Sequence, residues 1–168
     1  MATRKPRSTK RAARGARRSS AANAARNAAV RGKQKRRRGT PETLRLRGLE
    51  PSFTVNDIER SLRFYTDVLG FIVIEEMTDG EVLQGVLLQA GVCRLGLSQD
   101  DWAKGRDRSK GDGMRIWCKT AQDIDALAKR ITAAGGQLDG EPKNEPWGVR
   151  AISIKDPDGF LLSIYRDK

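Results

Sequence analysis

Few side chains in this 168-residue sequence are suited to acid–base or nucleophilic catalysis. It contains no histidine, which removes the commonest general base and the commonest metal ligand. Ser61 and Ser98 therefore have no imidazole to activate them as nucleophiles. Residues 104–108 (KGRDR) do not match the GxxxxGK[ST] pattern of a phosphate-binding loop. We interpret Glu75 and Glu76 as one solvated and one paired carboxylate, so the residues alone assign no catalytic group.

Two cysteines and two loop tryptophans are the next candidates. Cys93 and Cys118 fall in apolar strand patterns, and we expect buried free thiols of a cytoplasmic protein. Trp102 and Trp147 lie in loops, where each would either close over a ligand or pack without one. No run of about 18 apolar residues predicts a membrane span. The N-terminus also lacks the apolar stretch of a signal peptide.

The charge of the chain is concentrated in its first 40 residues. Residues 1–40 carry 15 Lys or Arg and no Asp or Glu, whereas residues 41–168 carry 18 basic and 21 acidic side chains. A basic segment of such low complexity is typical of a disordered arm. It favours non-specific binding of a polyanion or nucleic acid, but it contains no aromatic residues for base stacking. A solvated tail without a partner is the alternative.

The remaining residues, 41–168, predict one folded domain built from a repeated pattern. Alternation of apolar residues predicts strands, and apolar residues at helical spacing predict helices. The expected elements are a strand at 50–55, a helix at 57–69, strands at 71–77, 81–90, 92–98 and 114–118, a helix at 121–134, and strands at 137–140, 149–155 and 160–166. This is a βαβββ unit at about 48–98, a linking loop at 99–112 and a second βαβββ unit at about 113–167. The expected class is α+β, with a curved, mainly antiparallel sheet around a cleft.

Two segments of this pattern resemble a known family. Residues 55–71 (VNDIERSLRFYTDVLGF) and 154–166 (IKDPDGFLLSIYR) are similar to the signature regions of the vicinal oxygen chelate superfamily. That superfamily includes glyoxalase I, extradiol dioxygenases, fosfomycin-resistance enzymes and bleomycin-binding resistance proteins. The resemblance covers residues 48–167 and implies the fold more strongly than the function, because this fold carries out many chemistries.

The resemblance implies four positions where enzymes of the superfamily hold a divalent metal. In this sequence they fall at Glu50, Gly96, Gly113 and Ser163, and a shift of one residue brings Asp112 near the third. Only Glu50 is a good ligand, whereas a divalent metal needs several converging donors. We therefore expect no metal or other cofactor.

The same positions and the strand alternation predict which side chains line the cleft. They form a set of polar and aromatic residues: Glu50, Ser52, Thr54, Arg94, Ser98, Arg115, Trp117, Ser163 and Tyr165. Two guanidinium groups, an indole and a phenol suit an anionic or flat aromatic ligand. The alternative is that both arginines extend to solvent and that Trp117 belongs to the core.

Three functions therefore compete. The first is metal-independent binding of a small molecule, by a homodimer as the resemblance implies. The second is a lyase or dioxygenase whose metal is held by Glu50, Asp112 and a partner chain. The third is association with nucleic acid through residues 1–40.

Overall fold

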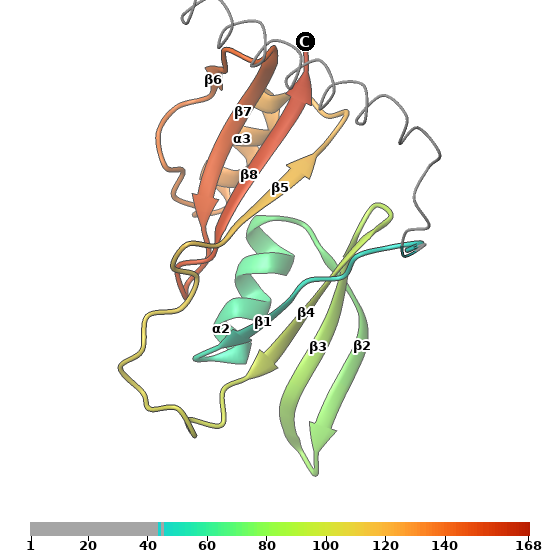
Figure 1. The fold of residues 1–168 in the computed structure, drawn as a ribbon, viewed down its shortest axis with the longest axis vertical. Helices are drawn as coiled ribbons and strands as arrows, with labels where there is room; N and C mark the ends of the chain where they lie inside the picture. The colour runs from blue at the N-terminus through green and yellow to red at the C-terminus, as the bar shows by residue number, and fades with distance from the viewer. Residues whose placement is uncertain (1–43, 45) are drawn as a thin grey trace, which may run out of the picture. The chain divides into compact units, whose positions relative to one another are not determined.

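The computed structural model describes Leu44 and residues 46–168, and residues 48–168 form one compact unit (Figure 1). Its elements are β1 (Ser52–Val55), α2 (Ile58–Arg63), the π-helical turn η1 (Phe64–Val68), β2 (Ile72–Asp79), β3 (Val82–Ala90), β4 (Cys93–Gln99), β5 (Arg115–Lys119), α3 (Ile124–Ala133), β6 (Lys143–Asn144), β7 (Val149–Lys155) and β8 (Leu161–Asp167). The predicted arm, residues 1–40, lies outside the described residues. No helix of the described part is long and apolar enough to cross a membrane.

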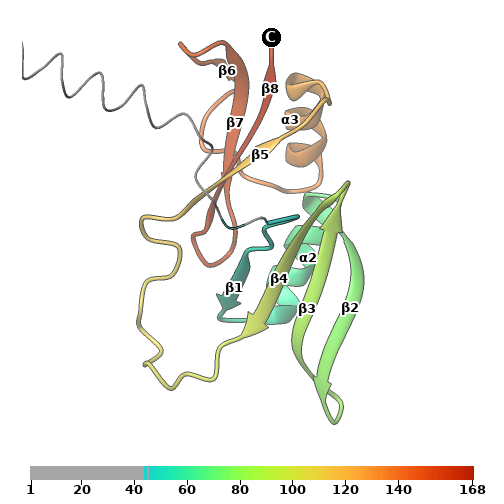
Figure 2. The same cartoon turned by 45° about the vertical axis from the view of Figure 1, so that its right-hand side comes forward.

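The strands form two separate four-stranded sheets. Sheet A has the order β1-β4-β3-β2, and sheet B has the order β5-β8-β7-β6 (Figures 1 and 2). In each sheet the first strand of the module pairs in parallel with the last, and all other pairs are antiparallel. The predicted α+β class, with two βαβββ modules and mainly antiparallel pairing, is confirmed.

Each module contains a helix that begins at an aspartate cap. Asp57 accepts a hydrogen bond from the Arg60 N–H, and Asp123 accepts one from the Ala126 N–H, both at 2.9 Å. These bonds satisfy amide groups that have no partner inside the helix. The first helix continues through η1, a wide turn that the spacing of its apolar residues did not predict. Gly70 follows with a φ of 80°, which glycine adopts without strain.

One face of each sheet is covered by a helix and the other is open. In β1, Phe53 and Val55 are buried, whereas Ser52 and Thr54 are exposed on the opposite face. This alternation is the one that the sequence predicts. Helix α2 contacts β3 and β4, and α3 contacts β7 and β8. The faces away from these helices are called the open faces of sheets A and B.

The two modules share one hydrophobic core. Buried residues of both sheets and both helices belong to a single cluster. Within this cluster, the rings of Phe53 and Phe160 stack with their centroids 4.0 Å apart and their planes 2° from parallel. Because these rings come from different modules, the core fixes one module against the other.

Two details of the sequence prediction are wrong. The strand expected at 137–140 is reduced to an isolated bridge between Leu138 and Ile154, because Gly140, with a φ of 92°, turns the chain before β6. Cys93, expected to be buried, is exposed because it begins β4 directly after a tight turn. Cys118 is partly buried, and burial raises its pKa to about 11.

Candidate functional site

The predicted site residues of sheet A lie together on its open face. Glu50 and Arg94 form an ion pair at 3.6 Å, and both side chains are about half exposed. Ser52 lies opposite Gly96 in the parallel register, and Thr54 lies opposite Ser98. Their side chains are polar and short, so this part of the open face offers hydrogen bonds and one solvent-screened ion pair.

The predicted site residues of sheet B surround an exposed tryptophan. Trp117 on β5 is 48% exposed, and its ring centroid lies 5.8 Å from that of Tyr165 and 6.3 Å from that of Trp147. Both neighbouring rings are inclined at 79° to Trp117, in the edge-to-face geometry that aromatic pairs prefer. The Arg115 guanidinium lies 5.5 Å from the centre of the Trp117 ring. We call Trp117, Trp147 and Tyr165 the aromatic group.

Ser163 is placed differently from the exposed residues around it. It lies opposite Trp117 in the register of β5 and β8, but it is only 1% exposed. Its hydroxyl lies 3.1 Å from that of Ser153 on β7. Since the half-buried Ser153 satisfies the buried Ser163 hydroxyl, Ser163 supports the aromatic group from within the sheet.

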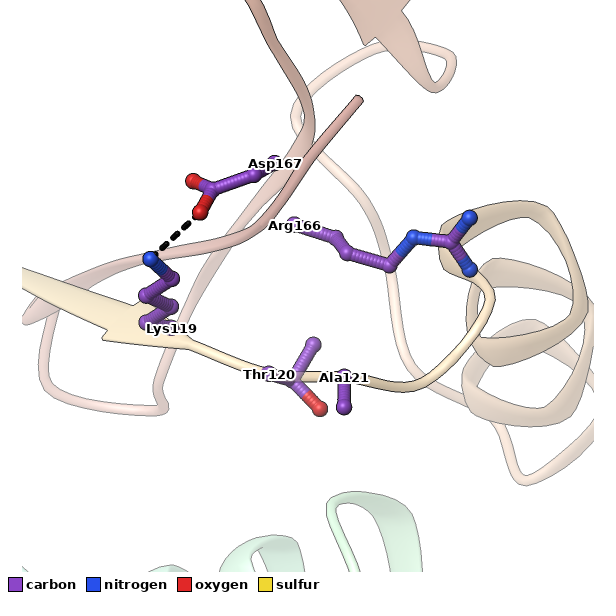
Figure 3. Close-up of a pocket in the computed structure, with 5 residues that line it drawn as sticks. All are labelled: Lys119, Thr120, Ala121, Arg166 and Asp167. Carbon is purple, nitrogen blue, oxygen red and sulfur yellow. Dashed lines mark hydrogen bonds and ion pairs between the residues drawn. The ribbon is translucent and has the colours of Figure 1, made fainter.

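A shallow hollow of about 530 Å³ lies at the end of β5 and β8, and it is lined by Lys119, Thr120, Ala121, Arg166 and Asp167 (Figure 3). Lys119, which lies opposite Tyr165, forms an ion pair with Asp167 at 2.5 Å, and this bond raises the pKa of Lys119. Arg166 points away from that pair, and its guanidinium lies 3.9 Å from the Asp123 carboxylate at the start of α3. The hollow is therefore lined mainly by charged and polar side chains, and none of the aromatic group lines it.

Trp102 does not join the aromatic group. It lies in the linking loop, where Arg106 and Lys110 approach its ring at 4.6 and 5.2 Å. The buried Asp100 carboxylate accepts a hydrogen bond from the backbone N–H of Trp102 and pairs with both Lys110 and Arg108, at 2.6 and 2.5 Å. The hydrogen bond from Lys110, and next in size the one from Arg108, hold the pKa of the Asp100 carboxyl well below its usual range. We call Asp100, Trp102, Arg108 and Lys110 the loop cluster, which fastens the linking loop.

The four positions carried over from the superfamily do not fit a divalent metal. Glu50 is paired with Arg94, Gly96 and Gly113 have no side chain to donate, and Ser163 is bonded to Ser153. Among the described residues, no three His, Cys, Asp or Glu side chains lie close enough together to hold a metal ion.

Some of these arrangements were not predicted from the sequence. The loop cluster was missed because residues 99–112 are polar and glycine-containing, which is typical of an exposed loop. The pairing of Lys119 with Asp167 joins residues 48 positions apart, and only the register of β5 on β8 brings them together. The proximity of Trp147 to Trp117 also depends on the position of the turn before β7.

Comparisons with known proteins agree with this architecture. The family model described as Glyoxalase/Bleomycin resistance protein/Dioxygenase superfamily matches residues 49–164. A probable lactoylglutathione lyase of Vibrio cholerae is 28% identical over 128 residues, which cover 71% of this chain and 90% of that protein.

Solved structures show the same similarity. TnmS3, an antibiotic binding protein from Streptomyces sp. CB03234, is 25% identical with a TM-score of 0.58, over 76% of this chain and 100% of that one. A glyoxalase/bleomycin resistance protein/dioxygenase from Nocardioides is 17% identical with a TM-score of 0.61, over 81% of this chain and 93% of that one. This chain therefore belongs to the Glyoxalase/Bleomycin resistance protein/Dioxygenase superfamily.

Proposed function

We propose that this protein binds a flat aromatic small molecule on the open face of sheet B, without a metal or other cofactor. The observation that carries the proposal is the exposure of Trp117 and Trp147, at 48% and 62%, next to each other and to Tyr165. Large exposed aromatic side chains that gather on one face are typical of binding surfaces. The name of TnmS3, an antibiotic binding protein, supports the same kind of function.

The geometry of the aromatic group favours a planar ligand. Because Trp147 and Tyr165 are inclined at 79° to Trp117, a ring that stacks on one of them presents its face or edge to the next. Each such aromatic contact contributes about 0.5–1.5 kcal/mol beyond the area it buries. Arg115 beside Trp117 favours an anionic substituent, since a guanidinium binds carboxylates in a bidentate manner.

Fluorescence titration tests this proposal. Naphthoate, naphthalene and naphthylmethylamine share one ring system and differ in charge. We expect naphthoate to quench tryptophan fluorescence most strongly, and Trp117→Leu to weaken its binding at least tenfold. Trp102→Phe is the matched control, because Trp102 lies in the loop cluster and not in the aromatic group. This substitution should leave binding unchanged. Arg115→Gln should abolish the preference for naphthoate over naphthalene. Equal quenching in Trp117→Leu and in the wild type would refute the proposal.

The competing function is a metal-dependent lyase, which the name of the Vibrio cholerae relative suggests. The test is metal content by mass spectrometry, followed by titration of Mn²⁺, Zn²⁺, Ni²⁺ and Fe²⁺ into the wild type and Glu50→Ala. Glu59→Ala is a control with an exposed glutamate on α2. We expect no stoichiometric metal in any of the three proteins. Metal that binds the wild type and Glu59→Ala but not Glu50→Ala would favour the lyase.

We further infer that the protein is a homodimer in the cytoplasm. The dimer follows from the resemblance to the superfamily, and sedimentation of the full chain at several concentrations tests it. Two free thiols, Cys93 and Cys118, support a reducing compartment.

Residues 1–40 support one more proposal, non-specific binding of a polyanion or nucleic acid. With 15 basic and no acidic side chains, this segment should release counterions from a nucleic acid on binding. Affinity for duplexes of unrelated sequence should be equal, should fall steeply with salt, and should be lost when residues 1–40 are deleted. Binding that persists in the deleted protein would contradict this role.

A further inference from the structure

Strand β2 exposes its whole length along the free edge of sheet A. It is the last strand in the order β1-β4-β3-β2, and in both views it is the outermost strand of that sheet (Figures 1 and 2). All eight of its residues are exposed, because α2 contacts β3 and β4 instead. The exposed side chains include Ile72, Ile74 and Met77, at 59%, 39% and 46%. An edge of this kind offers unpaired backbone N–H and C=O groups together with apolar area.

The same edge is uniformly acidic. Residues 72–92 contain no Lys or Arg, whereas they contain Glu75, Glu76, Asp79 and Glu81. None of these four carboxylates forms an ion pair within the described part of the chain. Glu75 lies opposite Leu87 on the open face, and Glu76 lies opposite the buried Val86 on the face toward α2. Both faces of the edge therefore carry a negative charge.

This charge determines which strand can pair with the edge. Two copies of β2 side by side would place glutamates against glutamates, and like charges on neighbouring strands are destabilising. The register of β2 on β3 is also irregular between Val73 and Glu75 and between Met77 and Thr78, which leaves a short regular stretch between the two irregularities. The β2 edge is therefore unsuited to pairing with β2 of a second molecule. It favours a short, extended segment that alternates basic and apolar residues.

The sequence contains a segment with this alternation. Residues 43–49 (TLRLRGL) alternate leucines with Arg45 and Arg47. Leu44, Leu46 and Leu49 are 83%, 65% and 85% exposed. We propose that residues 43–49 of a second copy add to β2 as a fifth strand of sheet A, with the arginines beside Glu75 or Glu76. Because each face of β2 carries one of these glutamates, the arginines meet a carboxylate in either orientation of the added strand.

Residues 43–49 cannot reach the β2 edge of their own molecule. Residues 43–49 lead directly into β1, which is the opposite edge of the sheet, and only Glu50 and Pro51 lie between them. Three strand spacings of about 4.8 Å each, about 14 Å in all, separate β1 from β2, whereas the three extended steps from Leu49 to Ser52 span about 10 Å. The donor is therefore a different molecule. This contact lies on sheet A and is independent of the ligand proposed for sheet B.

Disulfide trapping in the full chain tests the contact. One protein carries Leu46→Cys, another carries Ile74→Cys, and both carry Cys93→Ser to remove the exposed native thiol. The two proteins are mixed and oxidised. The control is Leu46→Cys mixed with a protein that carries Lys155→Cys, an exposed position on sheet B. The test pair should yield at least tenfold more linked heterodimer than this control. An acceptor with Met77→Cys, two positions from Glu75, covers the orientation that turns Leu46 to the open face. Linkage equal to the control with both acceptors would overturn the proposal, as would a link formed within one chain when both cysteines are in the same molecule.

Charge reversal gives a second readout. The acceptor is the protein that carries Ile74→Cys on β2. Adding Glu75→Lys and Glu76→Lys to it should reduce the trapped heterodimer to the level of the Lys155→Cys control. Adding Arg45→Glu and Arg47→Glu to the donor, the protein that carries Leu46→Cys, should then restore the trapped heterodimer. Glu75, Glu76 and Arg47 are exposed in the wild type, so far-UV circular dichroism should stay unchanged. Trapping that does not respond to either reversal would overturn the assignment of the arginines to the β2 glutamates.

Discussion

Tyr65 donates a hydrogen bond to Asp156 at 3.0 Å, although the two residues lie 91 positions apart and belong to different modules. Both side chains are buried. Asp156 also accepts the N–H groups of Asp158 and Phe160, so its carboxylate organises the turn between β7 and β8. Asp158 in the same turn accepts bonds from the Asn56 N–H and the Ser61 hydroxyl. A polar connection therefore runs beside the stacked phenylalanines that join the modules.

Replacing Tyr65 by phenylalanine tests the contribution of this bond. The change leaves one oxygen of a buried carboxylate without its donor, which costs about 1–3 kcal/mol. Urea denaturation should show that loss in the free energy of unfolding. Tyr165→Phe, which removes a hydroxyl from a partly exposed ring, should stay within about 0.5 kcal/mol of the wild type. Equal effects of the two variants would contradict a special role of the bond between Tyr65 and Asp156.

Asp156 should also give the protein a characteristic pH dependence. Burial raises its pKa above the usual 3.8, although its hydrogen bonds oppose that shift. The folded state thus holds the proton more tightly than the unfolded state does. The associated stability is present below pH 3.8 and is lost as the pH rises through the raised value. In Asp156→Asn this dependence is absent, so the free energy of unfolding of the wild type relative to the variant should fall over that pH range. A difference that rises with pH would contradict this sign.

Asp100 in the loop cluster should show the opposite dependence. Its two cationic partners lower its pKa below the usual 3.8, so its stabilisation is full above that pH and decreases as the pH falls further. At pH 7, Asp100→Asn leaves Lys110 and Arg108 without their carboxylate and should lower the melting temperature. Asp167→Asn, at an exposed pair, should have little effect. Similar melting temperatures for the two variants would mean that the loop cluster contributes no stability.

Gly111 marks a close contact between the linking loop and the turn after β7. A Cβ added there would lie 2.6 Å from backbone atoms of Gly159 and Phe160, and its φ is 70°. Gly105 has a φ of 87° but nothing within 4 Å of such a Cβ. Gly105→Ala should therefore cost about 1–2 kcal/mol, the strain of a left-handed alanine alone. Gly111→Ala should cost clearly more, as chemical denaturation would show. Equal costs would rule out the backbone contact.

The sequence predicts the modules well because their signals are local. Alternation in β1 and the Asp57 cap follow from residues a few positions apart, and both are confirmed. The alternation also places Ser52 and Thr54 on the open face, where the structure has them. These features depend on backbone geometry, which one segment of sequence is enough to specify.

The contacts that complete the candidate site depend on residues far apart in the chain. Ser163 was expected to line a cleft, but its partner Ser153 satisfies it within the sheet. Trp102 was expected either to close over a ligand or to pack without one, and in the structure two cations and the buried Asp100 carboxylate contact it in the linking loop. Polar composition alone did not distinguish this fastened loop from a solvated one, because burial of its charges results from packing against the second module.

The single core shared by both modules makes the covalent link between them less important than it seems from the sequence. Residues 103–107 are exposed, whereas the apolar contacts and the bond between Tyr65 and Asp156 lie elsewhere. A chain nicked within residues 103–107 should therefore remain one molecule, held by its interior. Separated halves would expose complementary apolar surfaces and would recombine, and halves from two different copies would be interchangeable.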